Sequence, residues 1–125
     1  MATKRILAVE DNDLVRSFLE ASLETDGYAV ETAHNGREAL EKLDRAPYDL
    51  IITDMRMPEL DGPAFCRALE RRSDVLARVL LLATPHSLEA HDAFLAETGL
   101  PAMLKPVRLE DLRSAVESML GADDP

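Results

Sequence analysis

Residues 49–54 of the chain, Asp-Leu-Ile-Ile-Thr-Asp, contain a continuous apolar run and end in an acid. A strand without polar alternation is typical of a parallel sheet that is covered by helices on both faces. Residues 5–9 (Arg-Ile-Leu-Ala-Val) and residues 78–83 (Arg-Val-Leu-Leu-Leu-Ala) have the same character. These three segments are therefore predicted to be the central strands, and each is followed by polar residues.

Helical periodicity follows each predicted strand. After the first strand, apolar residues recur at three- and four-residue steps from Val15 to Leu23; Asn12 or Asp13 offers an N-cap, and Gly27 ends the pattern. Two further helices are predicted to begin at Asn35-Gly36 and Gly62-Pro63, and two more to cover Ser87–Glu97, before Gly99, and residues 109–119. Weaker strands are predicted at residues 28–33 and 100–104. Five strand and helix pairs in alternation predict a doubly wound α/β fold.

Length and charge limit the possible functions. The 125 residues suffice for one hydrophobic core, so we expect a single domain over residues 1–125, with its core in 5–120 and a short acidic tail at 121–125. The 24 acids and 14 basic residues give a net charge of -10, which argues against direct binding to nucleic acid or an anionic membrane. One cysteine, Cys66, and the lack of a long apolar run predict a soluble, cytoplasmic chain without a disulfide, signal peptide or membrane span.

In a doubly wound sheet, ligands bind beyond the carboxyl ends of the strands. Glu10 and Asp11, Asp54, Thr84 and Lys105 all occupy such positions. Three converging carboxylates require a counter-charge, and a hard cation such as Mg2+ suits them. A hydroxyl and an ammonium group suit phosphoryl oxygens, and aspartate can form an acyl phosphate, so this set predicts phosphoryl chemistry on Asp54.

Each of these residues also has a simpler interpretation. The acids after the first strand suit a helix cap or a solvated turn, and Thr84 suits a helix cap. The argument for a site is that all of them lie at the same ends of successive strands.

The chain resembles the response-regulator receiver domain family, the CheY-like phosphoacceptor modules of two-component signalling. The resemblance extends from Arg5 to Leu120. The motifs that carry it are Val9-Glu10-Asp11-Asn12, Asp54-Met55-Arg56-Met57-Pro58 followed by Asp61-Gly62, Thr84, and Lys105-Pro106.

This resemblance implies strand order 2-1-3-4-5 and phosphorylation of Asp54 by a histidine kinase or a histidine phosphotransfer domain. It implies Mg2+ (or Mn2+) held by Asp11, Asp54 and the Arg56 carbonyl, with Glu10 acting mostly through water. Thr84 and Lys105 would contact the phosphoryl group, and the Lys105-Pro106 peptide would be cis. The module would be a signalling domain rather than an enzyme, although it would promote its own phosphorylation and dephosphorylation.

Three departures from the family pattern stand out. Ala102 replaces the common aromatic residue three positions before the lysine, so either another element switches, such as the loop after Thr84, or output needs no aromatic residue. Pro85 replaces a small residue, which either stiffens the loop or simply starts a helix. Arg56 and His86 occupy the positions two after Asp54 and two after Thr84, which in the family flank the entrance to the phosphoryl group, and we predict that they exclude water and slow self-dephosphorylation.

Other classes of protein share parts of this pattern. A haloacid dehalogenase-type hydrolase would carry a second aspartate where Arg56 stands, and a flavodoxin-like flavin binder would not place acids after the first strand. A degenerate receiver that only binds partners is also compatible with the fold. The output would be an effector protein or a covalently linked domain, and the chain would be a stand-alone regulator or part of a longer protein such as a hybrid kinase. A homodimer is possible.

Overall fold

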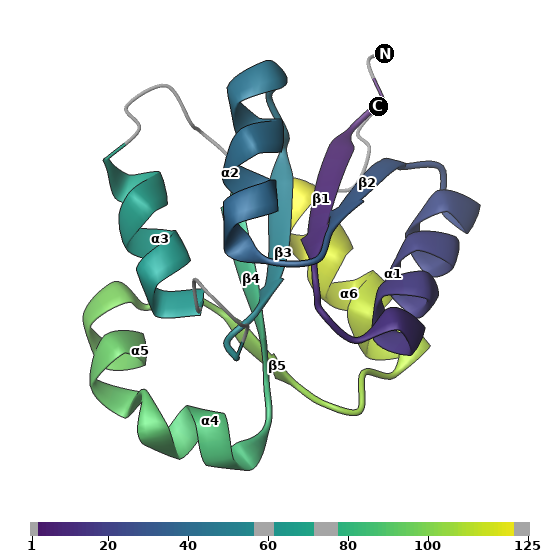
Figure 1. Cartoon of the computed structure of the whole chain (residues 1–125). Helices are drawn as coiled ribbons and strands as arrows, with labels where there is room; N and C mark the ends of the chain where they lie inside the picture. The colour runs from purple at the N-terminus through teal and green to yellow at the C-terminus, as the bar shows by residue number, and fades with distance from the viewer. Residues whose placement is uncertain (1–2, 57–61, 72–77, 122–125) are drawn as a thin grey trace.

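The computed structural model describes residues 3–56, 62–71 and 78–121. Five parallel strands form one sheet in the order β2-β1-β3-β4-β5, as predicted (Figure 1). The strands are β1 (Arg5–Val9), β2 (Ala29–Ala33), β3 (Leu50–Asp54), β4 (Arg78–Ala83) and β5 (Ala102–Leu104). The helices are α1 (Asp13–Thr25), α2 (Gly36–Arg45), α3 (Gly62–Glu70), α4 (Pro85–Ala90), α5 (Asp92–Thr98) and α6 (Leu109–Leu120).

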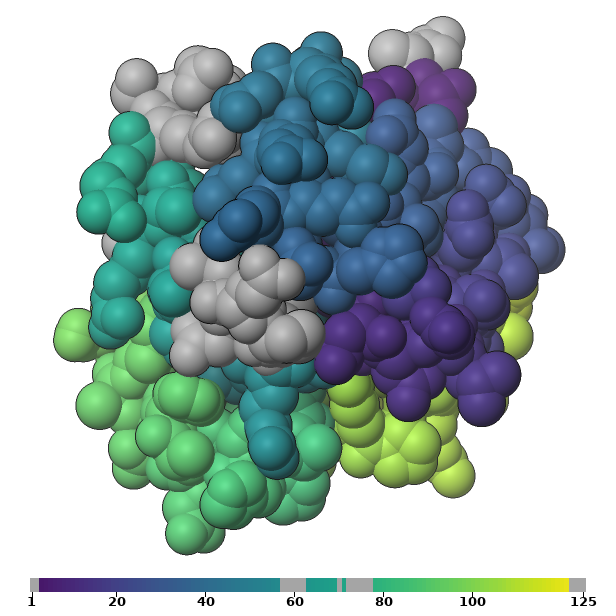
Figure 2. Space-filling model, in the orientation of Figure 1, coloured from purple at the N-terminus to yellow at the C-terminus, as the bar shows by residue number. Residues whose placement is uncertain are grey.

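Helices cover both faces of the sheet, which confirms the doubly wound class. On one face, Ile6 and Ile52 pack with leucines of α1 and with Leu112 of α6. On the other face, Leu7 and Ile51 pack with residues of α2 and α3. Figure 1 shows α2 in front of the central strands, and Figure 2, in the same orientation, shows the atoms of α2 covering this part of the surface. Burial on both faces explains why the central strands are uniformly apolar.

The single helix predicted over Ser87–Glu97 is wrong. Two helices, α4 and α5, occupy this stretch, and they meet at His91, whose φ of -122° and ψ of 29° lie outside the helical range. Leu88 and Phe94 both pack in the cluster around Met55. Positions six apart on one straight helix point about 120° away from each other, so the break lets both side chains reach the same cluster.

Two other predicted helix boundaries are confirmed. The side chain of Asn12 caps α1 by accepting a hydrogen bond from the Val15 N–H. Gly99 ends α5 with a left-handed φ of 66°, a conformation that glycine adopts without steric cost. In the part of the chain that the structure describes, no helix has the length and apolar character needed to cross a bilayer.

The register of the parallel strands brings their carboxyl ends together. Val9 of β1 lies beside Thr53, and Asp54 lies beside Leu82 of β4. Ala83 of β4 in turn lies beside Leu104 of β5. The residues that directly follow these strands therefore meet at one edge of the sheet.

Candidate functional site

An acidic cluster lies at this edge. Glu10, Asp11 and Asp54 each place a carboxylate oxygen within 4.8 Å of those of the other two. Glu10 is completely buried and Asp54 is 6% exposed, whereas Asp11 is exposed. The cluster is thus open to solvent on the side of Asp11, and the sequence prediction that these three acids converge is correct.

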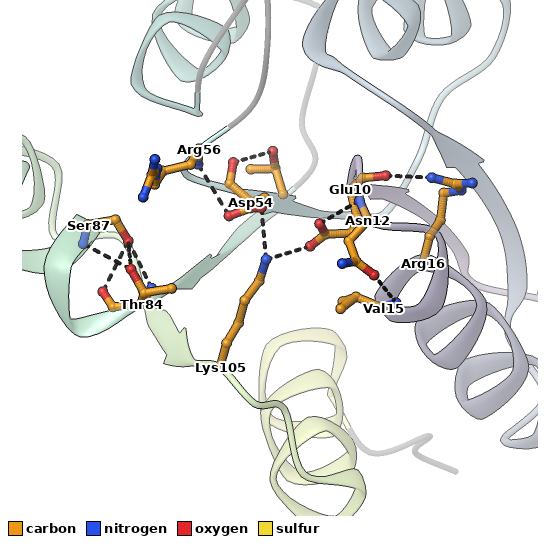
Figure 3. A network of polar contacts seen from close by, with 10 residues as sticks. Glu10, Asn12, Val15, Arg16, Asp54, Arg56, Thr84, Ser87 and Lys105 are labelled. Atoms are coloured by element: carbon orange, nitrogen blue, oxygen red, sulfur yellow. Dashed lines mark hydrogen bonds and ion pairs between the residues drawn. The ribbon is translucent and has the colours of Figure 1, made fainter.

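Lys105 enters the cluster from the end of β5. Its Nζ lies 2.8 Å from Asp54 Oδ2 and 3.0 Å from Glu10 Oε1 (Figure 3). The backbone anchors this lysine, because its N–H donates to the Ala83 carbonyl at 2.8 Å. The Lys105-Pro106 peptide bond is cis. One ammonium against three carboxylates leaves a formal charge of -2 at the site.

Burial and hydrogen bonding shift two pKa values in this cluster. The pKa of Glu10 is raised to about 6, chiefly by burial and to a lesser extent by the nearby Asp54, against the lowering effects of the Asn12 N–H and Lys105. Burial lowers the pKa of Lys105, but its contacts with the Asp54 and Glu10 carboxylates outweigh this effect and leave the pKa raised. At neutral pH Glu10 is therefore mostly ionised, Lys105 is protonated, and the two form a buried ion pair.

The donor set fits a divalent cation. Among the described residues, Glu10 Oε1 is the one buried side-chain oxygen or nitrogen that lacks a hydrogen bond, although it forms the ion pair with Lys105. A buried oxygen in this state, which faces two further carboxylates in a cluster that opens to solvent at Asp11, suits a hard cation that prefers oxygen ligands. The acidic cluster therefore fits a Mg2+ site.

Backbone contacts hold the two acidic loops in place. The Asn12 N–H donates to Glu10 Oε2 at 3.0 Å. The Arg16 guanidinium donates to the Glu10 carbonyl at 2.9 Å. On the other loop, the Arg56 N–H donates to Asp54 Oδ1 at 3.2 Å. Sequence reasoning missed Arg16; a basic residue one turn into the helix that follows an acidic loop is the pattern that could have indicated it.

Thr84 lies at the carboxyl end of β4, where it was predicted, but its side chain is engaged with α4. Thr84 is the N-cap of this helix, and it forms a reciprocal capping box with Ser87. Among the described residues, the Thr84 hydroxyl forms hydrogen bonds with Ser87 alone. Sequence reasoning missed Ser87, although a hydroxyl residue three positions after an N-cap threonine resembles the usual capping pattern.

The comparison with known proteins agrees with this geometry. The model of the "Response regulator receiver domain" family matches residues 6–117. The chain belongs to this family. This receiver domain is 38% identical over 121 residues to "Response regulator MprA" of Mycobacterium leprae, a match that covers 97% of the chain and 53% of the relative. The chain thus spans about half the length of the curated relatives that it matches.

Solved structures of other receivers share its fold. Chemotaxis response regulator CheY4 of Vibrio cholerae superposes with a TM-score of 0.87 at 33% identity, covering 95% of this chain and 100% of that one. The receiver domain of sensor histidine kinase PA1611 from Pseudomonas aeruginosa, solved with a magnesium ion in its active site cleft, gives a TM-score of 0.83 at 28% identity, covering 97% and 100%. These relatives give no support to the dehalogenase-type alternative.

The residues that depart from the family pattern all lie on the surface of this receiver domain. Arg56 is exposed beside Asp54, and Pro85 and His86 are exposed at the start of α4. Pro85 occupies the first helical position, directly after the N-cap. Ala102 is exposed on the edge strand β5. Residues 57–61, which complete the motif after Asp54, lie outside the described residues.

Proposed function

We propose that this receiver domain accepts a phosphoryl group on Asp54 in a reaction that depends on Mg2+ or Mn2+, and that it then changes a surface that binds other proteins. The observation that carries this proposal is the environment of the Asp54 carboxylate. It is nearly buried within an acidic cluster, and its Oδ2 lies 2.8 Å from the Lys105 ammonium. A nucleophilic carboxylate, a mobile positive charge and a place for a cation are the parts that phosphoryl transfer to aspartate requires.

The transfer itself is a simple exchange of bonds. One Asp54 oxygen attacks phosphorus and forms a P–O bond, while the P–N bond of a phosphohistidine breaks. The electron pair of that bond stays on the imidazole of the donor, which then takes up a proton. Lys105, already held beside Asp54, would stabilise the negative charge on the phosphoryl oxygens.

The acidic residues have a second role in this proposal. Glu10, Asp11, Asp54 and the Arg56 carbonyl would hold the divalent cation, with Glu10 acting largely through water. The bound cation supplies positive charge that offsets the repulsion between the carboxylates and the incoming phosphoryl group. Arg56, exposed beside Asp54, and His86, exposed at the start of α4, would limit the access of water to the acyl phosphate.

The donor would be a cytoplasmic histidine kinase or a histidine phosphotransfer domain. The output would be an effector protein or a domain joined to this one, as the greater length of the curated relatives suggests. A homodimer is a further possible output. The charge of -10 argues that nucleic acid, if it is the final target, is contacted by that other protein or domain.

Intact-mass measurement tests the proposal. The protein is incubated with acetyl phosphate and Mg2+, and we expect wild type to gain one phosphoryl group. Asp54→Asn should gain none, and EDTA should suppress the gain in wild type. Asp49→Asn is the matched control, because Asp49 precedes the same strand at its opposite end and should leave phosphorylation intact. A wild type that gains no mass, or an Asp54→Asn variant that gains it, would overturn the proposal.

A further inference from the structure

The first turn of α4 contains a closed set of hydrogen bonds between two hydroxyl residues. The Ser87 N–H donates to Thr84 Oγ1 at 3.1 Å, and the Thr84 N–H donates to Ser87 Oγ at 2.8 Å. The two hydroxyl oxygens lie 3.2 Å apart, and Ser87 Oγ also lies 3.1 Å from the Thr84 carbonyl. Ser87 is 1% exposed, so water does not compete for these contacts.

Each of the two hydroxyl protons in this set of hydrogen bonds can be assigned to one acceptor. A hydroxyl group has one proton to donate and two lone pairs to accept with. The Ser87 hydroxyl donates its proton to the Thr84 carbonyl, so the proton shared between the two hydroxyl oxygens is that of Thr84. The Thr84 hydroxyl proton is therefore directed to Ser87, and among the described residues it has no other acceptor.

The position of Thr84 relative to Asp54 gives this arrangement its significance. Asp54 pairs with Leu82 in the sheet, and Thr84 follows two residues later on the neighbouring strand end. In Figure 3 the Thr84 and Ser87 side chains form a group of their own beside the contacts of Asp54 and Lys105. The sheet topology thus places Thr84 close to the proposed phosphoryl position, but its hydroxyl donates its proton to Ser87.

We propose that Ser87 is a positioning residue of the phosphoryl site, which holds the proton of the Thr84 hydroxyl until a phosphoryl group on Asp54 takes it. This inference rests on the proposed function. A hydrogen bond from a hydroxyl to a charged phosphoryl oxygen is about twice as strong as one between two neutral hydroxyls. Phosphorylation would therefore turn the Thr84 hydroxyl away from Ser87 and leave the Ser87 N–H without its acceptor, which makes this turn the switching element in a chain that has Ala102 on β5.

Two contacts between Thr84 and Ser87 Oγ differ in whether they depend on phosphorylation, and this difference determines the expected effect of Ser87→Ala. The Thr84 N–H donates to Ser87 Oγ whether or not the Thr84 hydroxyl turns, so its loss affects both states alike. The contact between the two hydroxyls exists only before phosphorylation. Ser87→Ala should therefore favour the phosphorylated state, because coupling between two sites is reciprocal.

Binding of beryllium fluoride in the presence of Mg2+ provides the test, since this complex takes the place of a phosphoryl group on a carboxylate. The net stabilisation from one neutral hydrogen bond predicts that Ser87→Ala binds beryllium fluoride about fivefold more tightly than wild type. In a Thr84→Val background, Ser87→Ala should change the affinity by less than about twofold, because the hydroxyl through which Ser87 acts is missing. An unchanged affinity of Ser87→Ala, or an equal gain in the Thr84→Val background, would overturn the positioning role.

Matched variants separate this effect from general damage to a helix start. Asn35 caps α2 by accepting from the Glu38 N–H at 2.8 Å and has no contact with Thr84, so Asn35→Ala should leave the affinity unchanged. Ser87→Cys keeps the shape of the side chain with a weaker acceptor, and it should shift the affinity in the same direction if Ser87→Ala does not fold.

Amide hydrogen exchange gives a second readout that does not depend on affinity. The Ser87 N–H is protected by Thr84 Oγ1, and beryllium fluoride should accelerate its exchange in wild type. An unchanged rate at saturation would count against the proposal. If wild type neither binds beryllium fluoride nor gains a phosphoryl group, the proposed function fails together with this inference; if wild type does both and Ser87→Ala behaves identically, only the positioning role fails.

Discussion

The ionisation of Glu10 should make the free energy of unfolding depend on pH. Glu10 is completely buried, and burial raises its pKa from an ordinary value of 4.5 to about 6. At about 1.4 kcal/mol for each tenfold change in an equilibrium constant, this difference corresponds to about 2 kcal/mol. Glu10→Gln removes the charge while it keeps the shape of the side chain.

The sign follows from proton binding. The folded state holds the Glu10 proton more tightly than the unfolded state does, so folding is favoured at low pH. Stability contributed by this group falls as the pH rises from about 4.5 through about 6, and the loss is complete above about pH 7. Of the total, about 1.2 kcal/mol falls between pH 5 and pH 7.5. The glutamine variant does not titrate and lacks this decline.

Urea unfolding at a series of pH values between these limits, with EDTA present, measures the effect. The difference in unfolding free energy between Glu10→Gln and wild type should grow by about 1.2 kcal/mol in favour of the variant. Glu38→Gln is the matched control, because contacts with His34 outweigh burial and lower the pKa of Glu38, so its ionisation does not reduce stability as the pH rises. Parallel curves for wild type and Glu10→Gln would refute the assigned burial effect.

Four further outcomes are expected. Lys105→Met should lower the free energy of unfolding at pH 7.5 by about 3 kcal/mol in urea titrations, because it leaves two buried carboxylates unpaired, and an unchanged midpoint would contradict this. Asn12→Ala should lower it by about 1 kcal/mol through loss of the α1 cap, and no loss would show that the cap contributes nothing. Mg2+ at one hundred times its dissociation constant should raise the stability of wild type by about 2.7 kcal/mol, a gain that chelation should abolish in thermal unfolding. Replacing both Arg56 and His86 with alanine should shorten the acyl-phosphate lifetime severalfold in a mass-decay experiment, and an unchanged lifetime would argue against water exclusion by these residues.

The sheet was predictable because its strands have a simple environment. Residues of β1, β3 and β4 are covered on both faces, so an apolar run followed by a polar residue marks each of them. The break at His91 was not predictable in the same way. Leu88 and Leu95 lie seven residues apart and suit one continuous helix, and it is the packing of Phe94 around Met55, a contact distant in sequence, that requires two helices.

The residues of the candidate site were also predictable only in part. Glu10, Asp54, Thr84 and Lys105 were identifiable because strand ends in a parallel sheet must meet. The contacts of Arg16 and Ser87 were missed, since both involve backbone atoms whose positions depend on loop conformation. Sequence pattern thus identified which side chains converge, but it did not show that the Thr84 hydroxyl is bonded to α4 instead of facing Asp54.

The charges at the site explain why the proposed reaction needs a divalent cation as well as Lys105. Three carboxylates and one ammonium carry a formal charge of -2. Conversion of the Asp54 carboxylate to an acyl phosphate replaces one negative charge with about two, which brings the site to about -3. Lys105 has one ammonium group, and any turn toward phosphoryl oxygens weakens its ion pair with the completely buried Glu10. An uncompensated buried charge costs several kcal/mol, so the lysine alone cannot serve both acids and phosphate. A divalent cation in the acidic cluster brings the sum back to about -1 and frees the ammonium for the phosphoryl group.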